Sequence, residues 1–107
     1  MNRLRRSRIS AIILALQNMV GNEPDNIEDR LNDVYAEIED VCSEEEDTYD
    51  NYPPNLMESD NGYAMQEAID NLYLALDCIE EAKSADSFSD ASVNIEEAIS
   101  ALEEIVH

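Results

Sequence analysis

The sequence offers few side chains that could act as catalysts. Its one histidine, His107, is the last residue, and a side chain at a chain end is held too loosely for proton transfer, which depends on geometry before pKa. Neighbouring acids are common, as in Glu80-Glu81, Glu96-Glu97 and Glu103-Glu104. Such pairs lie where a solvated helix face is expected. No nucleophile, phosphate-loop or dinucleotide motif occurs. We therefore expect no catalytic residue, no cofactor and a protein that is not an enzyme.

Metal-binding patterns are equally weak. Cys42 and Cys78 are 36 residues apart, form no C-x-x-C pair and have no histidine near them in the sequence, which argues against a zinc site. Each cysteine falls within an apolar helical stripe and is expected to be a small buried side chain in a reducing compartment. A disulfide between neighbouring helices is the alternative. The acids of 44–47 could attract divalent cations loosely, but the EF-hand spacing is missing, so no metal site is predicted.

The N-terminal segment resembles a secretory signal only superficially. Four arginines within residues 3–8 precede the apolar stretch Ile9–Val20, as in a signal peptide. However, polar residues interrupt the stretch, no cleavage pattern follows, and a bilayer span needs about 20 apolar residues. We expect a soluble amphipathic helix here, a cytoplasmic protein and no membrane partner.

Apolar residues recur at steps of three and four in four segments, which predicts four helices. The second segment shows the step pattern over Ile27, Leu31, Val34, Ile38 and Val41. The third repeats it from Met65 to Ile79, and both have the heptad spacing of a helix seam. The expected helices cover residues 3–20, 25–49, 63–83 and 90–106, with a loop at 50–62.

Breaks between these segments predict how the helices end. Gly21 and Asn22 are expected to end the first helix in a left-handed conformation. Pro24 is expected to open the second, with Asp25 and Glu28 forming a capping box. Two prolines at 53–54 stop the second helix.

The serine- and aspartate-rich run at 84–90 favours a turn, although the third and fourth helices could still be one bent helix. Short connections make consecutive helices antiparallel. The predicted fold is all-α: a single domain over residues 1–107, built as an antiparallel up-and-down bundle of about four helices with a long helical hairpin at its centre.

Two motifs in the middle of the chain, D-N-Y-P at 50–53 and M-Q-E-A-I-D-N-L at 65–72, resemble those of a group of small, acidic, uncharacterised helical proteins of bacteria and bacteriophages. Residues Asp50–Pro53 read D-N-Y-P, which fits the D-N-x-P turn of the group. Residues Met65–Leu72 read M-Q-E-A-I-D-N-L and fit its following helix, M-x-E-A-I-D-N-L. About half of the chain is covered, and the breaks at 21–25 and 84–89 depart from the pattern. The resemblance implies a long antiparallel hairpin and a phage origin, with the host cytoplasm as the location, and nothing catalytic.

Acidic residues dominate the charge. The chain has 26 Asp and Glu against six Lys and Arg, for a net charge of −20, which excludes direct nucleic-acid binding, since that depends on Lys and Arg. From Ile9 onward only Arg30 and Lys83 are basic. Exposed helices normally pair their acids with cations one turn away. Because those cations are missing, this surface is not the usual salt-bridged one.

Mimicry of a nucleic acid is the function that this charge favours. Duplex DNA carries about one charge per 1.7 Å, and a helix rises about 1.5 Å per residue, so acids at every third or fourth position on several helices approach that density. We expect a protein-binding inhibitor that occupies the basic groove of a nucleic-acid enzyme of host defence, of the restriction or CRISPR type. The expected contact residues on the outer helix surfaces are Glu37, Asp40, Glu44, Glu45, Glu46, Asp47, Glu67, Asp70, Asp77, Glu80 and Glu81.

The loop at 50–62 holds three possible apolar anchors for a partner, Tyr52, Leu56 and Met57. The favoured interpretation is different: together with Tyr49 they fold back as a lid over the end of the bundle.

Two alternatives to mimicry stay open. The acidity could serve only solubility or adaptation to high salt. Alternatively, the heptad seams could pair between chains in a structural coiled-coil assembly module, for example a homodimer. The arginine-rich start could then hold the acidic surface of a second copy or contact anionic lipid or nucleic acid, although a solvated terminus is favoured and a helix N-terminus is a poor place for cations. Mimicry should weaken steeply with salt, whereas seam-driven assembly should not.

Overall fold

The computed structural model describes residues 1–106, and His107 lies outside the described residues. Four α-helices follow one another: α1 (Arg3–Gly21), α2 (Ile27–Asp50), α3 (Asp60–Lys83) and α4 (Phe88–Val106). A short 3₁₀ helix, η1 (Pro54–Leu56), interrupts the connection between α2 and α3. Residues 1–106 contain no strand, and the predicted all-α fold is confirmed.

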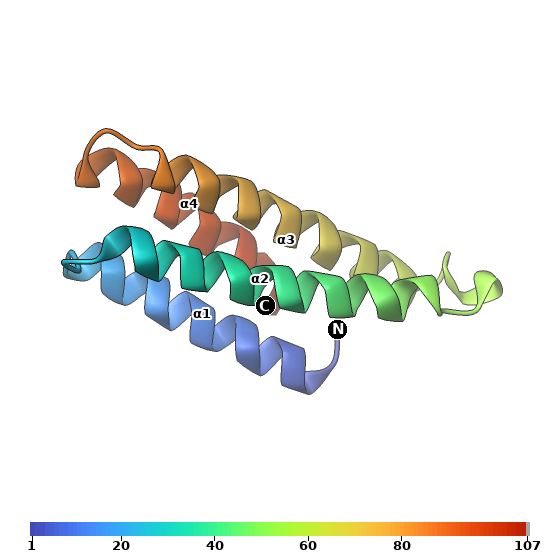
Figure 1. Cartoon of the computed structure of the whole chain (residues 1–107). Coiled ribbons are helices and arrows are strands. Elements are labelled where there is room, and N and C mark those ends of the chain that lie inside the picture. Colours follow the sequence, from blue (N-terminus) through green and yellow to red (C-terminus); the bar gives the residue numbers. More distant parts are fainter. Residues whose placement is uncertain (107) are drawn as a thin grey trace.

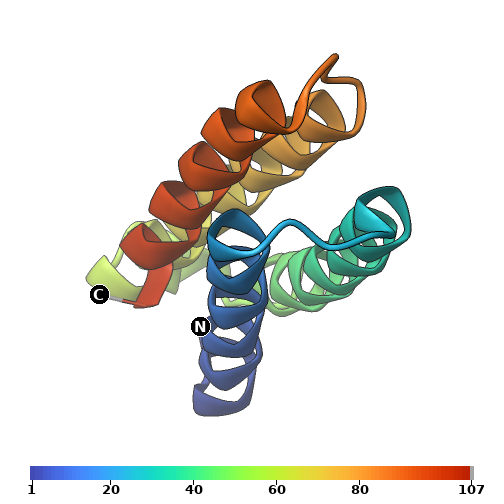
Figure 2. The ribbon, with the colours of Figure 1, turned by 90° about the vertical axis from the view of Figure 1, so that its left-hand side faces the viewer.

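Each helix packs on its neighbours in the chain, and α1 also packs on α4, which closes the ring. Consecutive helices run in opposite directions (Figure 1). The result is an up-and-down bundle measuring 48 × 21 × 20 Å. Viewed nearly end-on, α3 and α4 lie close together while α1 and α2 diverge (Figure 2). The α1–α2 contact is the least extensive of the four.

The heptad spacing explains the core. Each helix contributes two fully buried aliphatic side chains that are seven residues, or two turns, apart, so both face the bundle axis. Burial of each such side chain contributes about 1.5–3 kcal/mol. The pairs are Ile9 and Leu16, Leu31 and Ile38, Leu72 and Ile79, and Ile95 and Leu102.

Alanines explain why α3 and α4 share the most extensive contact. Ala68, Ala75 and Ala82 repeat every seven residues on α3, and Ala91 and Ala98 do the same on α4; all five are buried. Small side chains allow two helix backbones to approach closely. Helix α3 therefore has neighbours on two sides, α2 and α4.

The predicted left-handed end of α1 is wrong. No residue among 1–106 has a positive φ, and Asn22 is extended with φ −155° and ψ 92°. The segment after Gly21 has to cross from α1 to α2, the pair with the least contact. An extended segment of chain spans that gap better than a tight helix cap does.

The predicted capping box at Asp25 and Glu28 is also wrong. The helix begins two residues later than predicted, and no side chain caps it. The residue before it, Asn26, instead accepts a hydrogen bond from Nε of Arg30 at 3.3 Å. Pro24 therefore lies in the connecting turn rather than in the first turn of α2.

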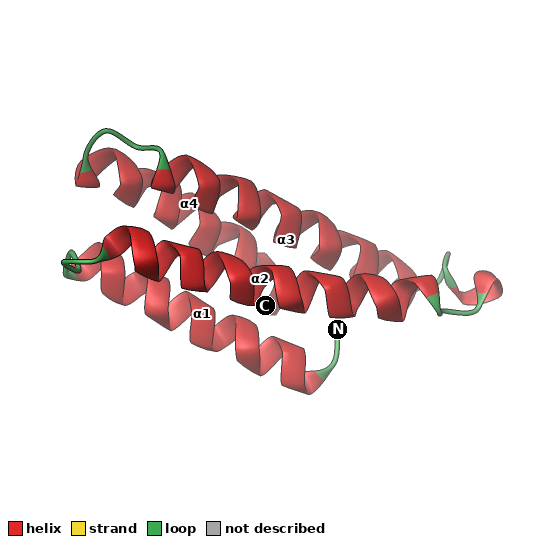
Figure 3. Cartoon of the chain, viewed as in Figure 1, coloured by secondary structure: helices red, strands yellow, loops and turns green. Residues whose placement is uncertain are grey.

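Serine side chains set the starts of α3 and α4. Ser59 Oγ accepts a hydrogen bond from the Gly62 amide at 3.3 Å, so α3 begins at residue 60 and not at Tyr63 as predicted. Ser87 Oγ accepts a hydrogen bond from the Asp90 amide at 3.2 Å. The turn predicted near residue 87 is confirmed, and α3 and α4 are separate helices joined by a loop (Figure 3).

The α2–α3 hairpin is the longest feature of the fold. Its two helices have 24 residues each, whereas α1 and α4 have 19. The tip of the hairpin therefore extends beyond the chain start and the end of α4 (Figure 1). Tyr52, Leu56 and Met57 lie at this tip and are not among the residues packed on the main core. The predicted lid over the bundle end is therefore wrong.

Candidate interaction surface

Acidic residues repeat every seven positions on the outer faces of three helices. Since the buried seam repeats at the same interval, residues seven apart on the opposite side also share one face. Eight acidic residues follow this spacing, and all of them are exposed. They are Asp33, Asp40 and Asp47 on α2, Asp70 and Asp77 on α3, and Asp90, Glu97 and Glu104 on α4. Asp33 and the three residues of α4 were not among the predicted contact residues, although their spacing in the sequence identifies them.

The outer face of α3 carries the most regular arrangement, here called the α3 stripe. Its six residues follow steps of four and three along about 27 Å of helix. Two of them, Tyr63 and Leu74, are apolar or aromatic and are 53% and 51% exposed. Along the stripe, each of these two side chains, which a partner can desolvate, is therefore followed by two carboxylates. It consists of Tyr63, Glu67, Asp70, Leu74, Asp77 and Glu81, all exposed.

Six of the predicted contact residues are open to a partner. They are exposed, and none of them forms an ion pair with another residue of 1–106. Here they are called the open acids: Asp40, Asp47, Glu67, Asp70, Asp77 and Glu81. Their role as contact residues stays a prediction.

The placement of Glu45 on the outer surface is wrong, because its side chain is fully buried. Its carboxylate lies 3.1 Å from Nη2 of Arg5 and 3.4 Å from the amino group of Met1. Glu45 follows Val41 by four residues and so continues the inward seam of α2. The heptad register was the signal that could have placed it inside.

Two further predicted acids, Glu37 and Glu44, bind the arginines of α1. Nη1 of Arg8 lies 2.6 Å from Oε2 of Glu44, and Nη2 of Arg8 lies 3.8 Å from Glu37. The hydrogen bond from Arg8 lowers the pKa of Glu44 below its usual value and raises that of Arg8. Within the arginine-rich start, Arg5 and Arg8 pair with acids of α2, which offset the unfavourable helix dipole. Arg3 and Arg6 are exposed and form no ion pair within residues 1–106, so the interpretation as a solvated terminus is wrong for Arg5 and Arg8 only.

Glu46 and Glu80 also have partners close to them. Tyr73 donates a hydrogen bond to Glu46 at 2.9 Å, which raises the pKa of Tyr73 to about 12. The thiol of Cys42 donates to the same oxygen at 3.6 Å. Glu80 pairs with Lys83 at 2.9 Å within α3. These two acids are less available to a partner than the open acids.

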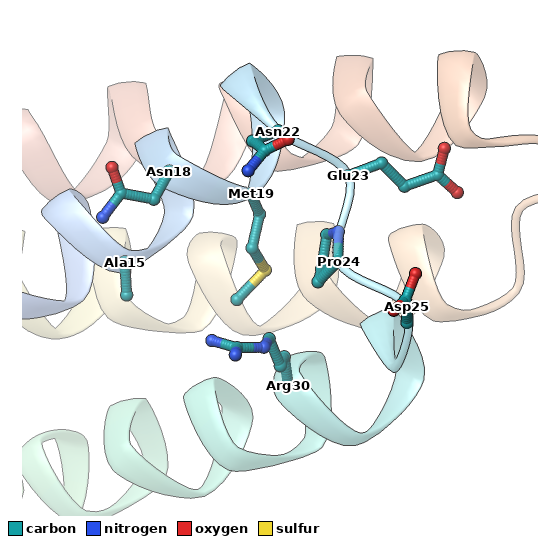
Figure 4. A pocket seen from close by; sticks show the side chains of 8 residues that line it. All are labelled: Ala15, Asn18, Met19, Asn22, Glu23, Pro24, Asp25 and Arg30. Carbon is teal, nitrogen blue, oxygen red and sulfur yellow. The ribbon is translucent and has the colours of Figure 1, made fainter.

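Two hollows lie along the divergent α1–α2 contact. The larger, about 550 Å³, sits at the turn between the helices, where Met19 of α1 and Arg30 of α2 extend into it (Figure 4). Its lining mixes amides, carboxylates and one guanidinium and contains no nucleophile. The smaller, about 270 Å³, is mostly apolar and is lined by Ala11, Ile12, Ala15 and Val34 with charged residues at its edge.

Within residues 1–106, no group of three or more His, Cys, Asp or Glu side chains is arranged to hold a metal ion. None of the helices in this range is long and apolar enough to cross a membrane. Comparisons with models of protein families, with curated proteins and with solved structures find no match.

Proposed function

We propose that the protein binds the basic nucleic-acid groove of another protein and takes the place of the nucleic acid there. The observation that carries the proposal is the row of open acids and heptad-spaced carboxylates on α2, α3 and α4. In such a complex the carboxylates replace phosphates opposite the partner's Arg and Lys side chains.

The density of charge supports this proposal. The bundle is 48 Å long, and a duplex of that length carries about 28 phosphates at one per 1.7 Å. The chain has 26 acidic residues. The number of negative charges per length is therefore close to that of a duplex.

The distribution of charge supports it as well. The three acidic faces belong to α3 and to the two helices that pack on it, α2 and α4, while α1 has no acid at all. Buried aliphatic pairs hold the helices in place, so the backbone that carries the carboxylates needs little ordering when a partner binds. A fixed acidic surface also attracts a basic partner over a distance and accelerates the encounter.

The class of partner follows from chemistry and from the resemblance to phage and bacterial proteins. A basic groove that normally holds DNA or RNA is the complementary surface. In a phage setting, the enzymes with such grooves that a small protein would block are restriction or CRISPR nucleases. Blocking needs only occupancy of the groove, so no catalytic residue is required.

Affinity capture from a bacterial host lysate tests the proposal. The immobilised protein is loaded at low salt, washed, and eluted with a salt gradient. We expect a nucleic-acid-binding enzyme to be retained and to be displaced by added duplex DNA. Retention that duplex DNA does not compete with would contradict mimicry.

Two variants of equal net charge separate the acidic surface from charge alone. Asp70→Asn with Asp77→Asn removes two acids of the α3 stripe. Glu28→Gln with Glu58→Gln removes two exposed acids outside the seven-residue rows. We expect the first pair to lower the salt concentration at which the partner elutes and the second pair to leave it nearly unchanged. Equal loss in both would mean that net charge alone retains the partner, and the proposal would be rejected.

A further inference from the structure

Helix α1 differs from the other three because it contains no acidic residue. Its outer face is made of small and apolar side chains at steps of three and four. Leu4 and Leu14 are 68% and 61% exposed, more than the other large apolar side chains of the described chain. The residues of this face, here called the α1 face, are Leu4, Ser7, Ala11, Leu14 and Asn18, all exposed.

Charges of opposite sign lie at the two ends of the α1 face. Arg3 at its start is exposed and forms no ion pair within residues 1–106. Beyond its far end, Glu23 and Asp25 are exposed and equally unpaired. The face is therefore positive at one end and negative at the other, with an uncharged middle.

We propose that the α1 face binds a second copy of this chain, with the two α1 helices antiparallel around a two-fold axis near Ala11. In this arrangement residue 3 of each copy lies opposite residue 19 of the other, and the long side chain of Arg3 extends toward Glu23 and Asp25 of the other copy, which begin about one helical turn further on. The same patch serves on both copies, as a two-fold interface requires. The small side chain of Ala11 allows the helices to approach closely where they cross. A parallel pair would instead bring like charges together at both ends.

The charge of the whole chain selects a second copy as the occupant. Two molecules of net charge −20 repel each other over α2, α3 and α4, and within residues 1–106 α1 is the one α-helix without acids. A membrane or nucleic acid is anionic and is repelled by the rest of the chain. A strongly basic protein is attracted more strongly to the acidic faces than to α1.

The hollow beside the α1 face supports the same conclusion. It lies between α1 and α2, is mostly apolar and has a volume of about 270 Å³, which is enough for a leucine side chain. Leu4 or Leu14 of a second copy would fill it. The dimer leaves the acidic surfaces of both copies facing outward, and it does not depend on the proposed mimicry.

Sedimentation velocity of the full chain over a range of micromolar concentrations tests this proposal. We expect a species of twice the 12.1 kDa monomer mass. Ala11→Glu puts two carboxylates face to face at the two-fold axis and should raise the dimer dissociation constant by about 100-fold or more. Leu74→Glu adds the same charge at an exposed leucine of α3 and should leave the dimer intact. A chain that stays monomeric, or an Ala11→Glu variant as dimeric as the original chain, would overturn the proposal.

A charge exchange tests the antiparallel arrangement. Arg3→Glu alone and Glu23→Arg alone should each weaken the dimer. The double variant should recover most of the lost affinity, because the pair is re-formed with its signs exchanged. Failure of the double variant to recover, while circular dichroism shows intact helices, would overturn the antiparallel contact.

Discussion

At the scale of single residues, the buried carboxylate of Glu45 has the largest structural role. It pairs with Arg5 and with the amino group of Met1 inside the bundle. Taking two charges out of water is costly, so such a pair adds little net stability, but breaking it is strongly unfavourable. Because the α1–α2 contact is the least extensive, the pair fixes the start of α1 against α2.

Removing the charge of Glu45 should therefore destabilise the fold. Glu45→Gln leaves the buried guanidinium of Arg5 with only the more distant carboxylate of Glu44, at 3.8 Å, as a counter-charge, and we expect the free energy of unfolding to fall by about 3 kcal/mol. Urea denaturation followed by circular dichroism measures this loss. Glu37→Gln is the control, since this exposed acid pairs only at 3.8 Å; its effect should stay within about 0.5 kcal/mol. Similar losses in both variants would contradict the structural role of Glu45.

The two cysteines should be unreactive while the chain is folded. Burial and the nearby Glu46 carboxylate raise the pKa of Cys42 to about 11, and burial also raises that of Cys78. A shift of two pKa units leaves about 100-fold less thiolate. At pH 8 we expect Ellman's reagent to modify Cys42 in the folded chain at least that much more slowly than in the urea-unfolded chain, and Cys78 also more slowly. The exposed Ser43→Cys variant should gain one fast-reacting thiol. Equal rates in the folded and unfolded chains would contradict the burial.

The same shift makes stability depend on alkaline pH. The thiol of Cys42 keeps its proton to a higher pH in the folded chain than in the unfolded chain, where the pKa is near 9. Its stabilising effect is therefore complete below pH 9 and is lost as the pH rises toward 11. We expect the decline of the urea midpoint over this range to be shallower in Cys42→Ala. An unchanged decline would show that other groups cause it.

At the scale of elements, the sequence predicted helix positions well and helix ends poorly. Seams such as Leu31 to Val41 depend on spacing within one helix, and that spacing is visible in the chain. The end at Asn22 depends on how far apart α1 and α2 lie, which is a property of the folded bundle. For the same reason the Arg8–Glu44 pair was not predicted: its residues are 36 positions apart and meet only in the folded bundle. The outward acids follow the heptad and were largely predictable.

Gly62 lies where two elements, η1 and α3, come too close together for a side chain to fit. It lies in the first turn of α3, where an added Cβ would come within 2.8 Å of the Leu56 carbonyl oxygen and closer still to that of Met57. Since the contacts are backbone atoms, they cannot move away alone. We expect Gly62→Ala to lower the free energy of unfolding by about 1–3 kcal/mol.

Gly21 provides the matched control for this substitution. It ends α1, and an added Cβ there meets nothing within 4 Å. Gly21→Ala should be neutral or stabilising by up to about 1 kcal/mol, because alanine favours helix more than glycine does. If Gly62→Ala proved as harmless as Gly21→Ala in urea denaturation, the close approach of η1 to α3 would be contradicted.

At the scale of the whole molecule, repulsion between the acidic residues opposes the packing of the helices. A net charge of −20 on a bundle about 21 Å wide means that the acidic faces repel each other across and along the rod. Three of the six Lys and Arg side chains, those of Arg5, Arg8 and Lys83, form ion pairs within residues 1–106. The aliphatic seams and the alanine contact must therefore hold the helices together against this repulsion.

Salt should accordingly stabilise the protein. The screening length is about 30 Å at 0.01 M salt, longer than the width of the bundle, and about 8 Å at 0.15 M. Repulsion between faces is therefore felt at low salt and largely screened at the higher concentration, while the buried Arg5–Glu45 pair is screened much less. We expect the thermal midpoint to rise with sodium chloride, and to rise less steeply in a variant with Asp40, Asp70 and Asp77 changed to asparagine. A midpoint that falls with salt would mean that ion pairs outweigh repulsion in this fold.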